Sequence, residues 1–188
     1  FLFKPFPQTI SLSKSGAVFR TRVDLYESHD PSELIQVFMS ELPPEDFKAY
    51  LRRGMVRDAR TEAYGQMLAG MGNPAEIIPD LQPLLKDRPV NIGAHRNYQS
   101  CSGRLGNSAA ILTEYREALK AEPDDAALQY LLGRLTDRQE ALQLWARAAA
   151  DPVAGPYALG AIAYDHLMFG QFDQALTTID RVPAGSDQ

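Results

Sequence analysis

The sequence predicts an all-α protein built from repeated pairs of short helices. The interval from Pro89 to Pro123 equals the interval from Gly72 to Gly106, a period of about 34 residues. An apolar face at positions i, i+4 and i+7 recurs four times, and one of its three intervals is four residues shorter than the other two. Self-similarity at a fixed period of about 20 to 50 residues is the signature of a stacked repeat protein.

The recurring face is typical of the apolar stripe of a short amphipathic helix. Its four copies are Ile77, Leu81 and Leu84; Ile111, Tyr115 and Ala118; Ala141, Trp145 and Ala148; and Ala175, Ile179 and Val182. One spacing could be chance, but three successive spacings could hardly be. We therefore expect each copy to be the second helix of a helix-turn-helix unit, and we expect Trp145 to be buried.

Residues 1–29 form a separate segment with the pattern of β-strands. From Val18 to Tyr26, apolar residues and threonine alternate with charged residues, which is the period of a strand. Residues 9–13 are predicted to pair with this strand through a turn at 14–16. Because an isolated hairpin is marginally stable, it is expected to pack on something, such as an upstream domain.

Residues 30–57 are expected to form a helical pair that is a degenerate repeat or a cap. One helix is predicted after Pro31 and a second after Pro44, because proline is tolerated in the first turn of a helix. Phe47 precedes Leu81 by one full repeat interval, so the pair is in register with the repeats. Terminal units of a stacked array are usually atypical.

The array itself is expected to span 58–188, in four units. The boundaries of the units are 58–91, 92–125, 126–155 and 156–188. The third is four residues short between Gly133 and Ala141, so its first helix or its turn is trimmed. Pro79 can stand in the first turn of a helix that begins near Ile78, but Pro83 cannot, so the second helix of the first unit is predicted to be irregular.

Small and polar residues mark the crossings and ends of these helices. Small residues are expected where two helices approach closely, at Gly65, Gly133 and Ala163. Glycines with positive φ are expected between paired helices, at Gly72, Gly106 and Gly170. Caps at helix N-termini are predicted at Asn73 with Pro74, at Asp137 with Glu140, and at the acids following Pro123.

These positions resemble the tetratricopeptide repeat (TPR) family. Unit 58–91 matches at Tyr64, Gly65, Leu68, Gly72, Leu81, Leu84, Leu85 and Pro89. Units 126–155 and 156–188 match well, whereas 92–125 matches poorly in its first helix, at His95, Tyr98 and Gln99. The resemblance implies a right-handed superhelix of helix pairs, a solenoid whose concave groove binds a partner protein or peptide.

Certain positions on the first helices of TPR arrays project into that groove. The resemblance places the partner-binding positions at Glu62, Gln66, Arg96, Ser100, Arg104, Tyr130, Arg134, Tyr164, Leu167 and Met168. Three arginines and two tyrosines on one channel would suit an acidic or carboxylate-bearing peptide, although the same residues could simply be solvated. The lysine and asparagine of the chaperone-tail clamp are replaced here, by Arg96 and Ser100 in one repeat. We expect Arg96 and Arg134 to matter for binding and little for stability.

Composition and the reactive residues argue against other functions. A net charge of -5 disfavours nucleic acid as the partner, and no apolar run is long enough for a membrane span. The lone Cys101 permits no internal disulfide, which is compatible with the cytosol and does not exclude the periplasm or secretion. His95 and Cys101 would not face one another on a helix, and neither would Asp165 and His166.

We therefore predict no catalytic residues, no metal site and no cofactor. His166 is expected to be a packed histidine, because the resemblance places a large core residue there, and His29 is expected to be exposed. The leading hypothesis is a non-catalytic protein-interaction scaffold. The alternative is a regulatory or substrate-recruiting appendage of a larger enzyme or transporter whose catalytic domain lies outside this chain.

Overall fold

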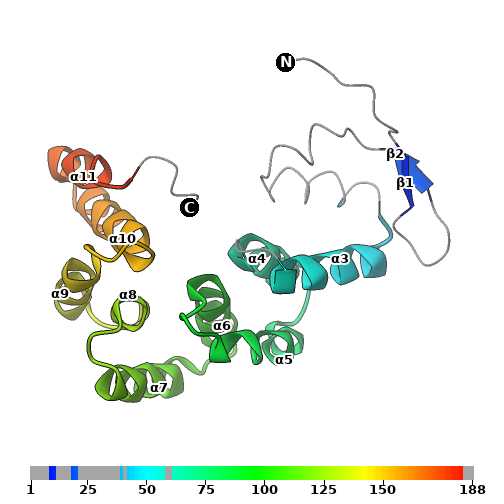
Figure 1. Cartoon of the computed structure of the whole chain (residues 1–188), viewed down its shortest axis with the longest axis horizontal. Coiled ribbons are helices and arrows are strands. Elements are labelled where there is room, and N and C mark those ends of the chain that lie inside the picture. The colour runs from blue at the N-terminus through cyan, green and yellow to red at the C-terminus, as the bar shows by residue number, and fades with distance from the viewer. Residues whose placement is uncertain (1–8, 12–17, 21–38, 40–41, 58–60, 184–188) are drawn as a thin grey trace. The chain divides into compact units, whose positions relative to one another are not determined.

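Helices dominate the structure, a computed structural model that describes residues 9–11, 18–20, 39, 42–57 and 61–183 (Figure 1). The fold therefore belongs to the all-α class, as the sequence predicted. The chain divides into two compact units, Phe1–Leu84 and Leu85–Gln188, called here the N-terminal and C-terminal units. The boundary between them lies within the first of the four expected repeats.

The N-terminal unit begins with two short strands. Strand β1 (Thr9–Ser11) pairs antiparallel with β2 (Val18–Arg20), with Ile10 opposite Phe19. These strands lie in the two segments for which the alternating pattern predicted them. The rest of the longer strand, His29 and most of the helix expected after Pro31 lie outside the described residues.

Helices α3 (Pro44–Arg57) and α4 (Thr61–Met71) form the core of this unit. Helix α3 starts at Pro44, as predicted, and carries two acidic residues in its first turn. Phe47 and Leu51 are almost fully buried. A Cβ atom on Gly54 would overlap the ring of Tyr64, so this glycine permits the close approach of the two helices.

The segment after α4 is broken into three short pieces, which confirms the irregularity predicted from its prolines. They are η1 (Pro74–Glu76), α5 (Ile78–Leu81) and η2 (Leu84–Lys86). Pro79 stands in the first turn of α5, and the helix ends before Pro83. Arg52 on α3 holds this segment through an ion pair with Asp80, with Nε and Oδ2 2.8 Å apart.

Gly72 does not adopt the positive φ that its repeat position predicted. The physical reason is the connection that follows it. Asn73 has an extended backbone, with φ -74° and ψ 123°, and its side chain accepts a hydrogen bond from the amide of Ala75. The predicted cap at Asn73 is therefore present, and it takes the chain into η1 without a left-handed residue.

The C-terminal unit is a succession of helix pairs. Its helices are α6 (Ile92–Arg104), α7 (Ser108–Ala121), α8 (Ala126–Gly133), α9 (Arg138–Ala148), α10 (Ala154–Met168) and α11 (Phe172–Ile179). Each helix contacts its neighbour in sequence. In addition, α8 contacts α6, and α10 contacts α8. Helix α8 has only 8 residues, which confirms the trimming predicted for the third repeat.

The turns and caps that the sequence predicted in this unit are present, and Asn91 caps α6 in addition, which the sequence analysis did not predict. Gly106 and Gly170 have φ values of 81° and 71°, in the left-handed region that glycine tolerates. Asp125 and Asp137 cap α8 and α9 by accepting hydrogen bonds from backbone amides three residues ahead. A Cβ on Gly133 would lie 2.5 Å from Nε1 of Trp145, so the predicted close crossing exists here.

The core of this unit runs through the inner faces of α6 to α10. Tyr115, Leu131 and Ala148 are almost fully buried in it. Trp145 is half-buried against this core, and its Nε1 donates a 3.1 Å hydrogen bond to the carbonyl of Tyr130. Within the described ranges, no helix combines the length and the apolar character needed to cross a membrane.

Candidate protein-interaction surface

The residues predicted to bind a partner fall in both units. Glu62 and Gln66 lie one turn apart on α4, in the N-terminal unit, and Gln66 Nε2 donates a 2.6 Å hydrogen bond to Glu62 Oε1. The other eight predicted residues lie in the C-terminal unit, on α6, α8 and α10. Their surroundings divide them into three groups.

On α6, Arg96, Ser100 and Arg104 are spaced four residues apart and so share one face. Ser100 and Arg104 are exposed, as the prediction requires. Arg96 is half-buried, with its guanidinium carbon 5.4 Å from the centre of the Tyr157 ring on α10. Its cation–π contact ties α6 to α10, so Arg96 also contributes to packing.

On α8, the structure corrects the prediction. Tyr130 is only 3% exposed and packs against Tyr157, with ring centroids 5.5 Å apart. It lies in the core because α10 packs against α8, and it presents almost no surface to a partner.

Arg134 is half-buried and donates from Nη1 to Oε1 of Gln99 at 3.0 Å. Gln99 in turn donates to the carbonyl of Leu131 at 2.9 Å. Gln99 is a buried amide that the sequence reasoning did not interpret. Its repeat position could have predicted its burial, because Gly133 and Ala163 occupy the same position in later repeats, where two helices were expected to approach closely.

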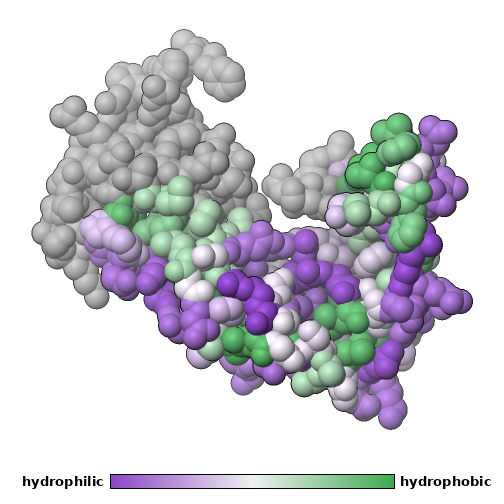
Figure 2. Space-filling model, turned by 180° about the vertical axis from the view of Figure 1, so that it is seen from behind, coloured by the Kyte–Doolittle hydropathy of each residue, from purple (hydrophilic) through white to green (hydrophobic). Residues whose placement is uncertain are grey.

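On α10, the predicted residues are exposed and have apolar neighbours. Tyr164, Leu167 and Met168 are 63%, 49% and 63% exposed. Four further side chains extend this area over the next turn and α11: Phe169, Phe172, Leu176 and Ile179. We call these seven residues the terminal apolar surface. Figure 2 shows hydrophobic side chains gathered over α10 and α11, at the upper right of the view.

The sequence prediction omitted the four residues beyond Met168. A signal was nevertheless present, because Phe172, Leu176 and Ile179 follow the i, i+4, i+7 spacing of one helix face. The repeat pattern assigned Ile179 to a buried position, and it is 46% exposed. The difference arises because no described helix packs on this side of α11.

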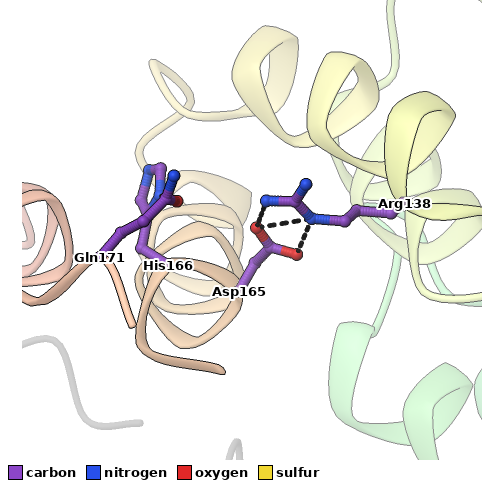
Figure 3. Close-up of polar contacts among 4 residues, drawn as sticks. All are labelled: Arg138, Asp165, His166 and Gln171. Carbon is purple, nitrogen blue, oxygen red and sulfur yellow. Dashed lines mark hydrogen bonds and ion pairs between the residues drawn. The ribbon is translucent and has the colours of Figure 1, made fainter. Parts of the chain in front are cut away.

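A basic side chain stabilises one edge of the terminal apolar surface (Figure 3). Arg138 Nε and Nη2 bind the two carboxylate oxygens of Asp165, each with a distance of 2.8 Å. The guanidinium carbon also lies 3.8 Å from the centre of the Phe169 ring. The hydrogen bonds to Asp165 raise the pKa of Arg138, which favours the charged guanidinium.

His166 points away from this pair, as the sequence predicted for neighbouring residues of a helix. Its Nδ1 donates a 2.7 Å hydrogen bond to Oε1 of Gln171. The expectation of a packed core histidine is wrong, because the ring is only half-buried and bonds to a surface amide. It lies in the last turn of α10, where the turn to α11 brings Gln171 beside it.

The remaining candidates for chemistry are buried. His95 Nδ1 lies 2.6 Å from the hydroxyl of Tyr115, and burial lowers the pKa of His95 to about 4. Both line a cleft of about 160 Å³ with Leu85, Arg88 and Glu114.

Cys101 is completely buried, and desolvation raises the pKa of its thiol, which disfavours the reactive thiolate. Within the described ranges, no three His, Cys, Asp or Glu side chains are grouped so that they could hold a metal ion.

Comparison with known proteins adds no relative from which a function could be transferred. No family model, no curated protein and no solved structure matches the chain.

Proposed function

We propose that this chain is a non-catalytic, TPR-like helical-repeat protein that binds a partner protein. The observation that carries the proposal is the terminal apolar surface, in which seven large apolar side chains are 46% to 63% exposed. Soluble proteins rarely leave large contiguous apolar patches in water unless the patch binds something. Aromatic residues and methionine are also the types enriched at protein interfaces.

The TPR-like assignment is supported by features that recur at the repeat spacing. Gly106 and Gly170, both with positive φ, end α6 and α10 at equivalent positions. Asn91 and Asp125 are 34 residues apart, and they cap α6 and α8 by accepting hydrogen bonds from backbone amides three residues ahead. The contact of Gly133 with Trp145 corresponds to the small-to-aromatic crossing of that repeat pattern.

A second part of the predicted groove supports binding of an acidic segment. Ser100 and Arg104 are exposed on one face of α6, and a guanidinium binds carboxylates with two parallel hydrogen bonds. Arg96 and Arg134 already contact Tyr157 and Gln99, so they are less available for this role. Arg104 is the exposed arginine of this face, and its exposure is the basis on which we assign it an acidic contact.

The proposal is tested by capture of partners on the immobilised 188-residue chain, compared among variants by mass spectrometry. The Phe172→Asp, Leu176→Asp double variant should lose the partners that the wild type captures. The matched control is Val153→Asp, because Val153 is 59% exposed and lies outside the terminal apolar surface. Unchanged capture by the double variant, with a native circular dichroism spectrum, would show that this surface is not used.

A further inference from the structure

The helix packing of the C-terminal unit indicates what shape fits the terminal apolar surface. Helix α8 contacts both α6 and α7, and α10 contacts both α8 and α9. The first helix of each following pair therefore packs on both helices of the preceding pair. The terminal apolar surface spans α10 and α11, which are the two helices of the last described pair.

Side chains at equivalent positions show that this surface continues the same interface. Leu112, Leu142 and Leu176 occupy one repeat position in three successive units. Leu112 and Leu142 are half-buried, where α8 and α10 follow, but Leu176 is 63% exposed. Likewise Tyr115 is 2% exposed and its equivalent Ile179 is 46% exposed. These repeat positions are covered by a following helix in the first two pairs, α6 with α7 and α8 with α9, and they are exposed in the third pair, α10 with α11.

Helix α10, which occupies this position against the preceding pair, indicates the shape of the occupant. Helix α10 presents small residues to the preceding pair, and Ala154 and Ala158 are completely buried. A Cβ on Gly155 would lie 2.8 Å from the carbonyl oxygen of Ala149, so the two backbones approach closely. An occupant that packs in the same way needs a helix with small residues on its apolar face.

The ion pairs between successive helix pairs set the charge of the occupant. Arg116 on α7 binds Glu140 on α9, with Nη2 and Oε2 3.0 Å apart. Arg138 on α9 binds Asp165 on α10 at 2.8 Å. In both interfaces the preceding pair supplies the base and the following pair supplies the acid.

Helix α11 reverses this polarity. Asp180 occupies the repeat position of Arg116, and Asp173 lies two turns before it on the same face. Both carboxylates are exposed, and they follow directly after the apolar residues Phe172 and Ile179. The exposed apolar stripe of α11 is thus flanked by acids, which a basic side chain of the occupant would complement.

We propose that the terminal apolar surface binds an amphipathic α-helix of a partner protein, whose small-residue apolar face is flanked by lysine or arginine. The helix lies against α10 and α11 as α10 lies against α8 and α9. This inference rests on the proposed function and names the class of partner for the surface. It differs from recognition of an acidic peptide, because the required charge is opposite.

The test uses three fluorescein-labelled peptides and the whole chain, with binding followed by fluorescence anisotropy. The first peptide is a helix with an alanine and leucine face flanked by lysines. The second carries glutamates in place of the lysines, and the third is a scrambled version of the first. The lysine helix should bind at least about tenfold more tightly than the glutamate helix, because like charges facing one another are destabilising. The scrambled peptide should not bind.

Variants of the chain locate the binding to this surface. Asp173→Lys with Asp180→Lys should reverse the preference between the lysine and glutamate helices. Leu176→Asp should abolish binding of both, whereas Val153→Asp should leave it unchanged. Circular dichroism of each variant establishes that α11 remains folded, since these are exposed positions.

Four outcomes would overturn the proposal. They are failure of the lysine helix to bind, equal or tighter binding of the glutamate helix, binding that survives Leu176→Asp, and a concentration-dependent dimer that Leu176→Asp abolishes. The last result, from sedimentation, would assign the surface to a second copy. If the lysine helix fails to bind but Leu176→Asp still loses a captured partner, only the helix proposal is wrong. If capture is also unchanged, the proposed function fails with it.

Discussion

At the residue scale, three polar contacts hold the C-terminal unit together from inside. Trp145 bonds to a backbone carbonyl of α8, Arg134 bonds to the buried Gln99, and His95 meets Tyr115. Each contact places a polar atom where water is scarce. Loss of one partner removes a hydrogen bond that water replaces poorly, and the change in stability is measurable.

Trp145→Ala should lower the free energy of unfolding by about 3 kcal/mol, at the low end for large aromatic truncations because the ring is half-buried. The loss combines a cavity beside Gly133 with the loss of the indole hydrogen bond to the carbonyl of Tyr130, which keeps its hydrogen bond from the amide of Arg134. Urea unfolding measures it. Leu105→Ala is the control, since Leu105 is 38% exposed and should change stability by about 0.5 kcal/mol or less. Equal effects of the two variants would contradict the packing described for Trp145.

Arg134→Ala should destabilise the protein, which corrects the expectation from sequence that this arginine matters only for binding. Its guanidinium donates to Oε1 of the buried Gln99, and a buried acceptor that loses its hydrogen bond costs about 1–3 kcal/mol. Arg104→Ala, at an exposed position, should melt like the wild type. Thermal unfolding of the two variants in the same buffer distinguishes a stabilising arginine from an exposed one. Identical melting temperatures would argue against the contact of Arg134 with Gln99.

Stability should fall as the pH drops from about 6.5 towards 4. The pKa of His95 is lowered from 6.5 to about 4 in the folded protein, so the unfolded chain binds the proton more tightly in this window. Between pH 7 and pH 5 the loss from this group should be about 2 kcal/mol. Urea unfolding at both pH values, compared with His95→Gln, isolates the contribution. A slope unchanged by the substitution would mean that His95 titrates normally.

At the element scale, the starts and ends of helices follow from local chemistry. Proline placed the start of α3 and the break after α5, and aspartates placed the starts of α8 and α9. These features depend on a few neighbouring residues, which is why the sequence predicted them. The conformation of Gly72 depended on the irregular segment that follows it, and a repeat pattern contains no information on that segment.

Asp137→Ala should cost about 1 kcal/mol, the usual effect of removing an N-cap. Its carboxylate accepts from the amide of Glu140 at 3.0 Å and begins α9. Asp124→Ala is the matched control, because Asp124 is an exposed acid beside the Asp125 cap. Chemical denaturation of both variants tests the cap, and a larger loss for Asp124→Ala would reverse the assignment.

At the scale of the whole molecule, the contacts define two units whose boundary the sequence did not predict. Periodicity assigned 58–91 to one repeat, but the structure places the boundary between Leu84 and Leu85. Periodicity reports which residues are equivalent, and it does not report where contacts are few. The same limit explains the site: Tyr130 and Ile179 hold repeat positions, but their exposure depends on whether a following helix is present.

The fragment 85–188 should fold by itself, because it contains its own core from α6 to α10. Purified alone, it should give a helical circular dichroism spectrum and one cooperative unfolding transition. The fragment 92–188, which begins at the start of α6, is the comparison. An unfolded 85–188 fragment would show that the two units stabilise each other.

The rate at which a thiol reagent labels Cys101 can report how often the native protein opens locally. Cys101 is the only cysteine of the chain, and its side chain has no solvent exposure. A thiol reagent can therefore label the native protein only during moments when α6 opens. At low denaturant, the labelling rate measures how often these openings occur. Amide hydrogen exchange measures the same kind of opening, but the thiol reports it at a single known atom, the sulfur of Cys101. A partner that stabilises the helices from α6 to α11 would lower the labelling rate of Cys101, so this rate also reports whether the partner is bound.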